Sequence, residues 1–240
     1  MKKFTKKIYE TSTLHIEDLE ITLYRKAVKK IYIRVASNNG EIYIIAPKKY
    51  PLIDIKVLIL EKLSWIKKYH QHFLANKTPE INFCNGDQIE LFGKKYLLEI
   101  KRNQEKNLVI TDYHQKITFL VNDQIDHQSF EKLLNHFYRI ELKKILIPMV
   151  NKWQKNMKLT AKFIGIKKMK TKWGSCNFNQ ARLWFSSELA KKPIEAIEYV
   201  VVHELGHLIE PSHNKKFAMI MNHYLPNWQD SKKKLGYGRI

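Results

Sequence analysis

The spacing of apolar residues changes once along this chain, and that change limits the fold more than any other feature. Before about residue 123, apolar and polar residues alternate in short segments such as Lys30–Ala36 and Glu41–Ala46. Alternation with a period of two indicates β-strands, and the Asn38-Asn39-Gly40 turn between these two segments predicts a β-hairpin. From about Gln128 onward, apolar residues recur every three or four positions, which predicts helices. The chain is therefore expected to be an α+β protein.

Two regions follow from this change: a β-hairpin-rich N-terminal module over residues 1–125 and a second domain over residues 126–240. The module contains one predicted helix, Leu52–His72. The second domain begins with a long amphipathic helix that Pro148 is expected to kink, and its basic tail, Asp230–Ile240, is expected to fray. No internal repeat is visible in the sequence. The other predicted elements are the strands Ile21–Arg25, Tyr96–Ile100, Leu108–Thr111, Ile117–Val121, Phe163–Met169 and Arg182–Ser186 and the helices Glu195–Ile209 and Asn214–Tyr224.

The charge of the chain is strongly positive. It has 43 Lys and Arg residues against 23 Asp and Glu residues, which gives a formal net charge of +20. A surface of this kind attracts polyanions and anionic small molecules. Because the lysines are spread over the whole length, we interpret most of the charge as a solvated surface rather than a dedicated polyanion site.

The cysteines and the apolar runs bear on location. Cys84 and Cys176 lie far apart in the sequence, and two unpaired thiols are typical of a reducing compartment, so a cytoplasmic protein is expected. The basic N-terminus is not followed by the apolar segment of a signal peptide. The longest apolar runs fall short of the roughly 18 residues of a membrane helix, so no membrane partner is expected.

A histidine pair carries the strongest chemical signal. His203 and His207 flank Glu204 within the most apolar segment of the chain, Tyr199–Ile209. On a helix, residues four apart project from one face, and two imidazoles one turn apart can hold one zinc ion at about 2.0–2.1 Å each. In metalloproteases, the Glu that follows the first His is the general base. The pattern predicts one zinc ion per chain, with another divalent ion as the alternative.

A third ligand is needed, because a catalytic zinc site has three protein ligands and an open fourth position. His213 follows Pro211, which cannot continue the helix, so the chain is expected to turn there and bring His213 back to the metal. The alternatives for the third ligand are Asp230, His223 and Glu210, although Glu210 better suits a role in the last turn of the helix.

Further motifs accompany these histidines. They are Trp173-Gly174-Ser175-Cys176, Pro193, Tyr199-Val200-Val201-Val202-His203-Glu204-Leu205-Gly206-His207-Leu208, Ser212-His213 and Phe217, and, more weakly, Tyr32–Val35, Ala46-Pro47, Trp65-Ile66, Gly86-Asp87 and Phe92–Tyr96. With these residues the chain resembles the YgjP-like metallopeptidase domain family, which is related to SprT-like zincins. The resemblance implies a zincin-like catalytic domain over residues 126–240, built on an H-E-x-x-H helix. It also implies that His203, His207 and His213 are the metal ligands and that Glu204 is the catalytic acid/base.

The expected function is therefore a zinc-dependent metallohydrolase, above all a metallopeptidase that acts on a peptide or protein. The resemblance places the Trp-Gly-Ser-Cys segment beside the active-site cleft, and we expect four residues to line that cleft, namely Lys172, Trp173, Ser175 and Ser186. Cys176 is expected to have a structural role, because a fourth protein ligand would close the catalytic position. If Arg182–Ser186 is an exposed edge strand, an extended peptide could add to it by main-chain hydrogen bonds. The residue that stabilises the oxyanion stays open among Tyr199, His223, Tyr224 and Lys172.

Two alternatives keep the metal and change the substrate. A metal-dependent phosphohydrolase acting on anionic nucleotides would use the basic segment Lys167–Lys172 for phosphates and Trp173 to stack on a base. A nucleic-acid-associated protease is the second alternative, although the sequence contains no zinc-finger or helix-turn-helix signature.

Overall fold

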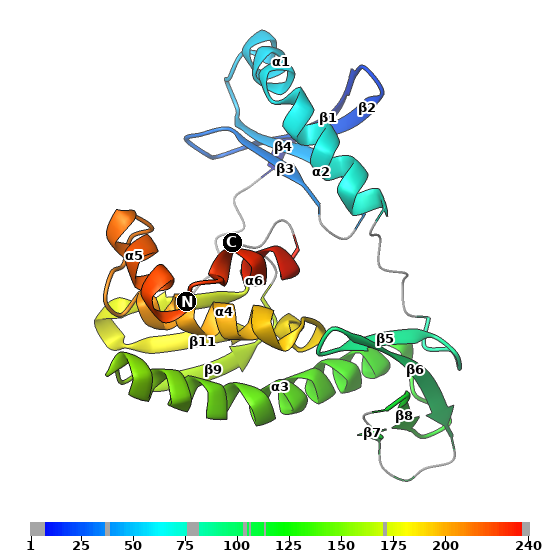
Figure 1. Cartoon of the computed structure of the whole chain (residues 1–240). Helices are drawn as coiled ribbons and strands as arrows, with labels where there is room; N and C mark the ends of the chain where they lie inside the picture. Colours follow the sequence, from blue (N-terminus) through cyan, green and yellow to red (C-terminus); the bar gives the residue numbers. More distant parts are fainter. Residues whose placement is uncertain are drawn as a thin grey trace. The chain divides into compact units, whose positions relative to one another are not determined.

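The chain divides into two compact units, Met1–Pro79 and Glu80–Ile240, which we describe separately. The computed structural model describes residues 8–36, 39–75, 82–102, 105, 107–112, 114–169 and 172–236, and Figure 1 traces their helices and strands. The division differs from the boundary expected at residues 125 and 126. The strands after residue 80 group with the helices that follow them, not with the N-terminal hairpins.

The first unit contains a four-stranded sheet with the order β1-β2-β4-β3. Its strands are β1 (Ile8–Ile16), β2 (Leu19–Lys26), β3 (Tyr32–Val35) and β4 (Ile42–Pro47). Strands β3 and β4 are antiparallel, which confirms the predicted hairpin, although Asn38 of its turn lies outside the described residues. Strand β2 pairs with β4 in parallel and with β1 in antiparallel. Sequence alternation did not reveal β1.

Two helices, α1 (Leu52–Glu61) and α2 (Leu63–Ala75), occupy the segment for which one helix was predicted. The break lies at Lys62, whose N–H donates to the carbonyl oxygens of Leu58 and Ile59. Both helices bury apolar side chains in the same cluster as the sheet. The helical residues of this cluster are Ile55, Ile59 and Ile66, each with 0% exposure.

A second four-stranded sheet opens the larger unit, with the order β5-β6-β8-β7. Its strands are β5 (Gln88–Leu91), β6 (Lys94–Lys101), β7 (Leu108–Thr111) and β8 (Lys116–Leu120). The outer pairs are antiparallel and the central pair β6–β8 is parallel, as in the first sheet. Each sheet is also followed by helical structure. The topology thus repeats, although the sequence shows no repeat.

The long helix α3 (His127–Met157) joins this sheet to the rest of the unit. Its N-cap is Asp126, whose carboxylate accepts from the N–H of Ser129, and the helix continues through Pro148, where a kink was predicted. The Phe130 ring stacks on Phe83 with a centroid distance of 4.8 Å. Because β5–β8 and α3 share one apolar core with the later helices, the predicted boundary at the start of α3 falls inside a compact unit.

A three-stranded sheet follows, with the order β10-β11-β9. Its strands are β9 (Phe163–Lys167), β10 (Gly174–Asn177) and β11 (Arg182–Ser186). Strand β11 is therefore central, pairing in parallel with β9 and in antiparallel with β10. Arg182–Ser186 is therefore not the edge strand that peptide addition to it would require. The edge beside the later helices belongs to β10.

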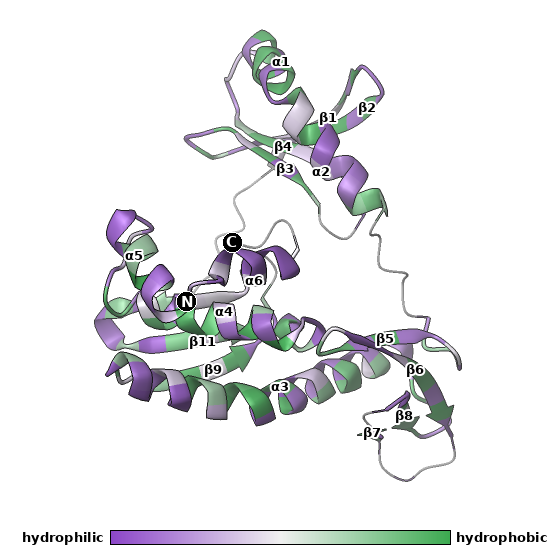
Figure 2. Cartoon of the chain, in the orientation of Figure 1, coloured by the Kyte–Doolittle hydropathy of each residue, from purple (hydrophilic) through white to green (hydrophobic). Residues whose placement is uncertain are grey.

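Three helices complete the unit: α4 (Ile194–Gly206), α5 (Lys215–Tyr224) and α6 (Trp228–Lys234). The start of α4 is held by the β5–β6 turn, where the N–H of Phe92 donates to the carbonyl oxygen of Ala190 at 2.7 Å. Gly93 in this turn has φ +77°, and a Cβ there would meet Pro193 at 2.8 Å. Helix α6 is hydrophilic along most of its length (Figure 2) and includes the first residues of the tail that was expected to fray, whereas residues 237–240 of that tail lie outside the described residues. Among the described helices, none is both long and apolar enough to cross a bilayer.

Candidate metal centre

The end of α4 carries the histidine pair. His203 and Glu204 lie in its last turn, and the N–H of His207 donates to the carbonyl oxygen of His203 at 3.2 Å, so the helical path extends to the second histidine. The preceding residues Val200–Val202 and the following Leu205 are buried and fix this turn in the core. A rigid helix end therefore presents both imidazoles on one side.

The chain after α4 returns the third imidazole. His213 directly precedes Asn214, whose side chain accepts from the N–H of Phe217 and so caps the start of α5. The Nε2 atoms of His203 and His213 lie 3.0 Å apart. One ring nitrogen from each of His203, His207 and His213 lies within 4.8 Å of the others. The Phe217 ring packs against all three imidazoles, with centroid distances of 4.6 to 5.0 Å.

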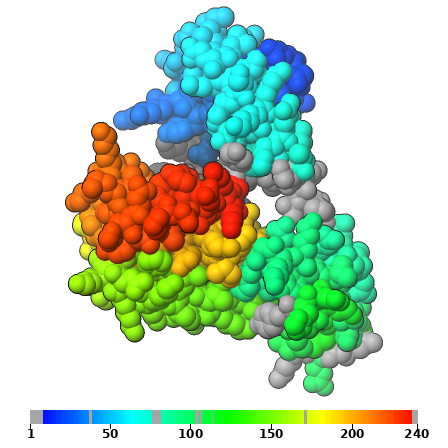
Figure 3. Space-filling view, in the orientation of Figure 1, coloured from blue at the N-terminus to red at the C-terminus, as the bar shows by residue number. Residues whose placement is uncertain are grey.

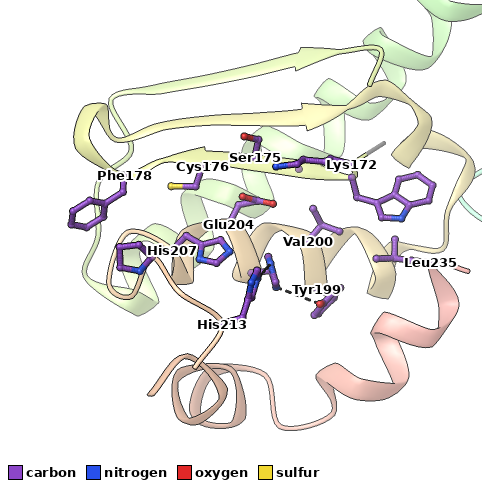
Figure 4. Close-up of a pocket in the computed structure, with 14 residues that line it drawn as sticks. Lys172, Ser175, Cys176, Phe178, Tyr199, Val200, Glu204, His207, His213 and Leu235 are labelled. Atoms are coloured by element: carbon purple, nitrogen blue, oxygen red, sulfur yellow. Dashed lines mark hydrogen bonds between the residues drawn. The ribbon is translucent and has the colours of Figure 1, made fainter. Parts of the chain in front are cut away.

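Hydrogen bonds orient two of the rings. The Nδ1–H of His207 donates to the carbonyl oxygen of Glu210 at 3.1 Å. Because a carbonyl only accepts, this bond leaves the Nε2 lone pair of His207 available. The Nδ1 atom of His203 lies 3.3 Å from the hydroxyl of Tyr199 one turn earlier (Figure 4). Contacts of this kind set the orientation and basicity of histidines that bind metals.

The electrostatics of the rings suit a divalent cation. Burial, with His207 and His213 nearby, lowers the pKa of His203 to about 3, and burial also lowers the pKa of His207. Both imidazoles are therefore neutral at physiological pH, as metal binding requires. Three imidazole nitrogens at these separations fit a zinc ion, whose bonds to imidazole are about 2.0–2.1 Å long.

The other candidates for third ligand lie elsewhere. The Asp230 carboxylate pairs with Lys233 at 2.7 Å, and the His223 ring packs on Tyr224. The Glu210 carboxylate accepts from the N–H of Ser212. Within the described part of the chain, none of these three joins the histidine group.

Glu204 points from α4 towards β10 (Figure 4) and is only 5% exposed. Burial raises the pKa of its carboxyl group to about 8, although Lys172 acts in the opposite direction. Its side chain rests against Gly174 of β10, where an added Cβ would lie 2.5 Å from a Glu204 carboxylate oxygen. Glycine at this position therefore leaves the space that the Glu204 side chain occupies.

If Glu204 is the general base that the sequence predicts, Gly174→Ala should lower turnover roughly 100-fold, because displacing a reacting group by about 1 Å has an effect of that size. The added methyl group would push on both the Cγ and carboxylate atoms of Glu204, so the side chain must rotate. Metal content should stay at the wild-type level, because Gly174 contacts no histidine in the group. The measurement is kcat beside zinc content, with Asn177→Ala, on the same strand but outside the cavity lining, as the control. Unchanged turnover in Gly174→Ala would contradict this account of Glu204.

A cavity of about 280 Å³ opens beside these groups. Its lining includes three of the four residues expected in the substrate cleft, namely Lys172, Trp173 and Ser175. Ser186 is instead fully buried and does not line the cavity, and its Oγ has no hydrogen-bond partner among the described residues. Cys176 also lines the cavity, and burial raises the pKa of its thiol to about 11.

The expected base-stacking role of Trp173 does not fit the structure. Its side chain is 7% exposed and the Lys192 ammonium lies 5.4 Å from its ring centroid. Lys172 is exposed at the cavity, whereas Lys170 and Thr171 of the same basic segment lie outside the described residues.

Several residues of the site escaped the sequence interpretation. Phe178 and Leu235 line the cavity from a turn and from the end of α6, and neither has a distinctive spacing to the histidines. Tyr199 was considered only as an oxyanion stabiliser. Its spacing of four residues before His203 could have predicted the contact between the two side chains.

Comparison with known proteins identifies the family of the chain. The family model described as "YgjP-like, metallopeptidase domain" matches residues 29–237. The chain belongs to the YgjP-like metallopeptidase family. The resemblance seen in the sequence is thus confirmed, and membership supports a metal-dependent peptide hydrolase. Strands β1 and β2 both precede the matched residues of this YgjP-like chain.

Comparison with solved structures finds similarity over only part of the chain. A crystal structure of the metallopeptidase zymogen of Methanocaldococcus jannaschii, jannalysin, is similar to 38% of this chain and covers 92% of its own chain. The sequence identity is 24% and the TM-score is 0.34. No curated protein matches the chain.

Proposed function

We propose that this protein is a zinc-dependent metallopeptidase in which His203, His207 and His213 hold the metal and Glu204 is the general base. The convergence of three imidazole nitrogens within 4.8 Å of one another carries this proposal. A buried carboxylate next to this group, at a cavity with room for substrate, supports it further. The domain that carries this chemistry is the larger unit, and the role of the N-terminal unit stays open.

Each group has a task in this proposal. The zinc ion, when bound, supplies a Lewis acid that activates water and polarises a carbonyl group. A carboxylate oxygen of Glu204 accepts the proton of the attacking water and passes it to the leaving nitrogen. Burial raises the pKa of this carboxyl group, and a group that exchanges protons in catalysis works best when its pKa lies closer to the working pH. Tyr199 and Glu210 hold the rings of His203 and His207.

The edge of β10 offers a place for the substrate backbone. Gly174–Asn177 pairs with β11 on one side only, and its first three residues line the cavity beside Glu204. An extended peptide would add to this edge through main-chain hydrogen bonds, a mode that recognises backbone rather than side chains. The strand to which we propose that a peptide adds is therefore β10, not the central strand β11.

The zinc-loaded full chain is expected to cleave an unfolded protein such as casein, to lose this activity with a chelator and to regain it with added zinc. The reason is that the histidine group provides the metal site and Glu204 the proton acceptor. Released peptides are measured by mass spectrometry. Zinc-loaded protein that binds about one metal ion but cleaves no peptide would contradict the metallopeptidase proposal.

A metal-dependent phosphohydrolase acting on nucleotides is the second candidate. The observation that favours it is Lys172, an exposed cation at the cavity close enough to counteract the rise in the pKa of Glu204. An ammonium group there would attract phosphate oxygens. Release of phosphate or pyrophosphate from nucleoside triphosphates, with a preference for Mg²⁺ and no cleavage of casein, would favour this candidate.

A further inference from the structure

A second cavity, of about 310 Å³, lies against the same histidines. It is bounded by Tyr199 and His203 of α4, by the segment from His213 into α5, and by Trp228 and Lys232 of α6. In the space-filling view, the orange and red residues of α5 and α6 lie next to each other on one face of this unit (Figure 3). Both cavities share Tyr199, His203 and His213, so this second cavity borders the histidine group directly.

The positive charge in this cavity comes from Lys232, the first of three consecutive lysines. Lys233 pairs with Asp230 at 2.7 Å, and Lys234 pairs with Glu195 at 3.2 Å. Lys232, which is half-buried, has no carboxylate partner among the described residues. It is also the lysine that faces the cavity, because it follows Trp228 by four residues and shares its side of α6.

The lining of this second cavity contains no acidic side chain. The Lys232 ammonium lies 5.8 Å from the centroid of the Trp228 ring, and the neutral ring of His203 lies on the same cavity. A half-buried cation without a counter-ion is poorly compensated, and this makes an anionic ligand favourable there. Ligand sites commonly combine an apolar slot with one such charged group.

Aromatic side chains form an apolar wall of this cavity beside the charge. The Trp228 ring stacks on Tyr199, with an interplanar angle of 8° and a centroid distance of 6.0 Å. The indole N–H of Trp228 donates to the side-chain oxygen of Asn222 at 2.7 Å, which fixes the ring. Phe217, itself 5% exposed, also lines the cavity. A short aliphatic chain ending in a carboxylate would suit this apolar wall and the cation.

We propose that this second cavity is a carboxylate subsite, in which Lys232 binds the acidic group of a substrate residue next to the cleaved bond. The inference rests on the proposed metallopeptidase function and names its substrate class, peptides with Asp or Glu at that position. The free carboxylate at the C-terminus of a short peptide has the same chemistry and is the other source of the anion.

The first test measures binding, so that it does not depend on turnover. Zinc-loaded Glu204→Gln protein is titrated with two capped tripeptides that differ only in a central Glu or Gln. We expect the Glu peptide to bind about tenfold more tightly, as for a hydrogen bond between charged groups. Adding Lys232→Met should abolish that preference. The control is Lys234→Met, which removes the same charge from the same helix but from an ion pair with Glu195.

The second test measures cleavage by the wild-type chain. The Glu-to-Gln ratio of kcat/KM should be about ten in the wild type and Lys234→Met and near one in Lys232→Met, as for loss of one charged hydrogen bond. Lys232→Glu should reverse the preference towards substrates with Lys or Arg. Comparing amidated with free C-termini separates the two sources of the carboxylate.

Distinct results overturn the two proposals. Equal binding of the Glu and Gln peptides, or a preference that survives Lys232→Met, would overturn the subsite. The subsite would also be overturned if Lys232→Met weakened the binding of a nucleoside triphosphate but left the binding of both peptides unchanged. Absence of all peptide cleavage, with the binding preference intact, would instead overturn the metallopeptidase function and leave the carboxylate subsite standing.

Discussion

Glu204→Gln is expected to abolish peptide turnover while leaving the metal in place. Gln has nearly the shape of Glu but cannot accept a proton from water, and a positioned general base typically contributes about 10²–10⁴-fold to the rate. Since Glu204 is buried beside Gly174 and is not one of the grouped histidine ligands, its replacement should not disturb metal binding. The measurement is kcat on a defined peptide together with zinc content by atomic emission.

The control for this prediction is Glu195→Gln, the same chemical change in the first turn of the same helix. The exposed Glu195 carboxylate pairs with Lys234 at 3.2 Å and lies outside the histidine group, so this variant should keep turnover within a few-fold of wild type. If Glu204→Gln retained more than about a tenth of the activity, another group would have to accept the proton, and the general-base assignment would be wrong.

Local spacing predicted the residues of the centre well. The four-residue interval between His203 and His207 depends only on helical geometry, and the apolar residues around it ensured that the segment would fold as a buried helix. The return of His213 followed from one rule, that Pro211 cannot continue a helix. The sequence-derived α+β class and the hairpin of β3 and β4 also agree with the structure, because each rests on short-range patterns.

Long-range pairing was not predictable in the same way. The position of β11 at the centre of its sheet depends on partners on both sides, and the alternation within Arg182–Ser186 carries no information about them. The boundary at residue 125 followed a change in period, yet compact units are set by shared cores. Phe83 and Phe130, on either side of that boundary, stack on each other. Ser186 was predicted to line the substrate cleft but is fully buried, because its burial also depends on long-range packing.

His213→Ala is expected to remove most of the zinc and, with it, the activity. Loss of one of three protein ligands should raise the dissociation constant by more than about 100-fold, since even changes to the groups that orient a ligand reduce affinity by roughly 10–100-fold. Because His213 is exposed and follows a turn, its truncation should leave the fold of the metal-free chain intact. The His213→Ala variant therefore tests metal affinity without a change in the stability of the fold. A substitution of the more buried His203 would change both.

Thermal unfolding gives a readout of this prediction that needs no turnover. A ligand at 100 times its dissociation constant stabilises the folded state by about 2.7 kcal/mol, so zinc should raise the Tm of wild type but not that of His213→Ala. His223→Ala is the matched control, because its ring packs on Tyr224 outside the histidine group, and it should respond to zinc as wild type does. Full zinc content in His213→Ala would move the search for the third ligand to His223 or Asp230. If zinc content fell only in His223→Ala, His213 would not be a metal ligand. The 3.0 Å separation between the Nε2 atoms of His203 and His213 would then be a hydrogen bond between the two rings.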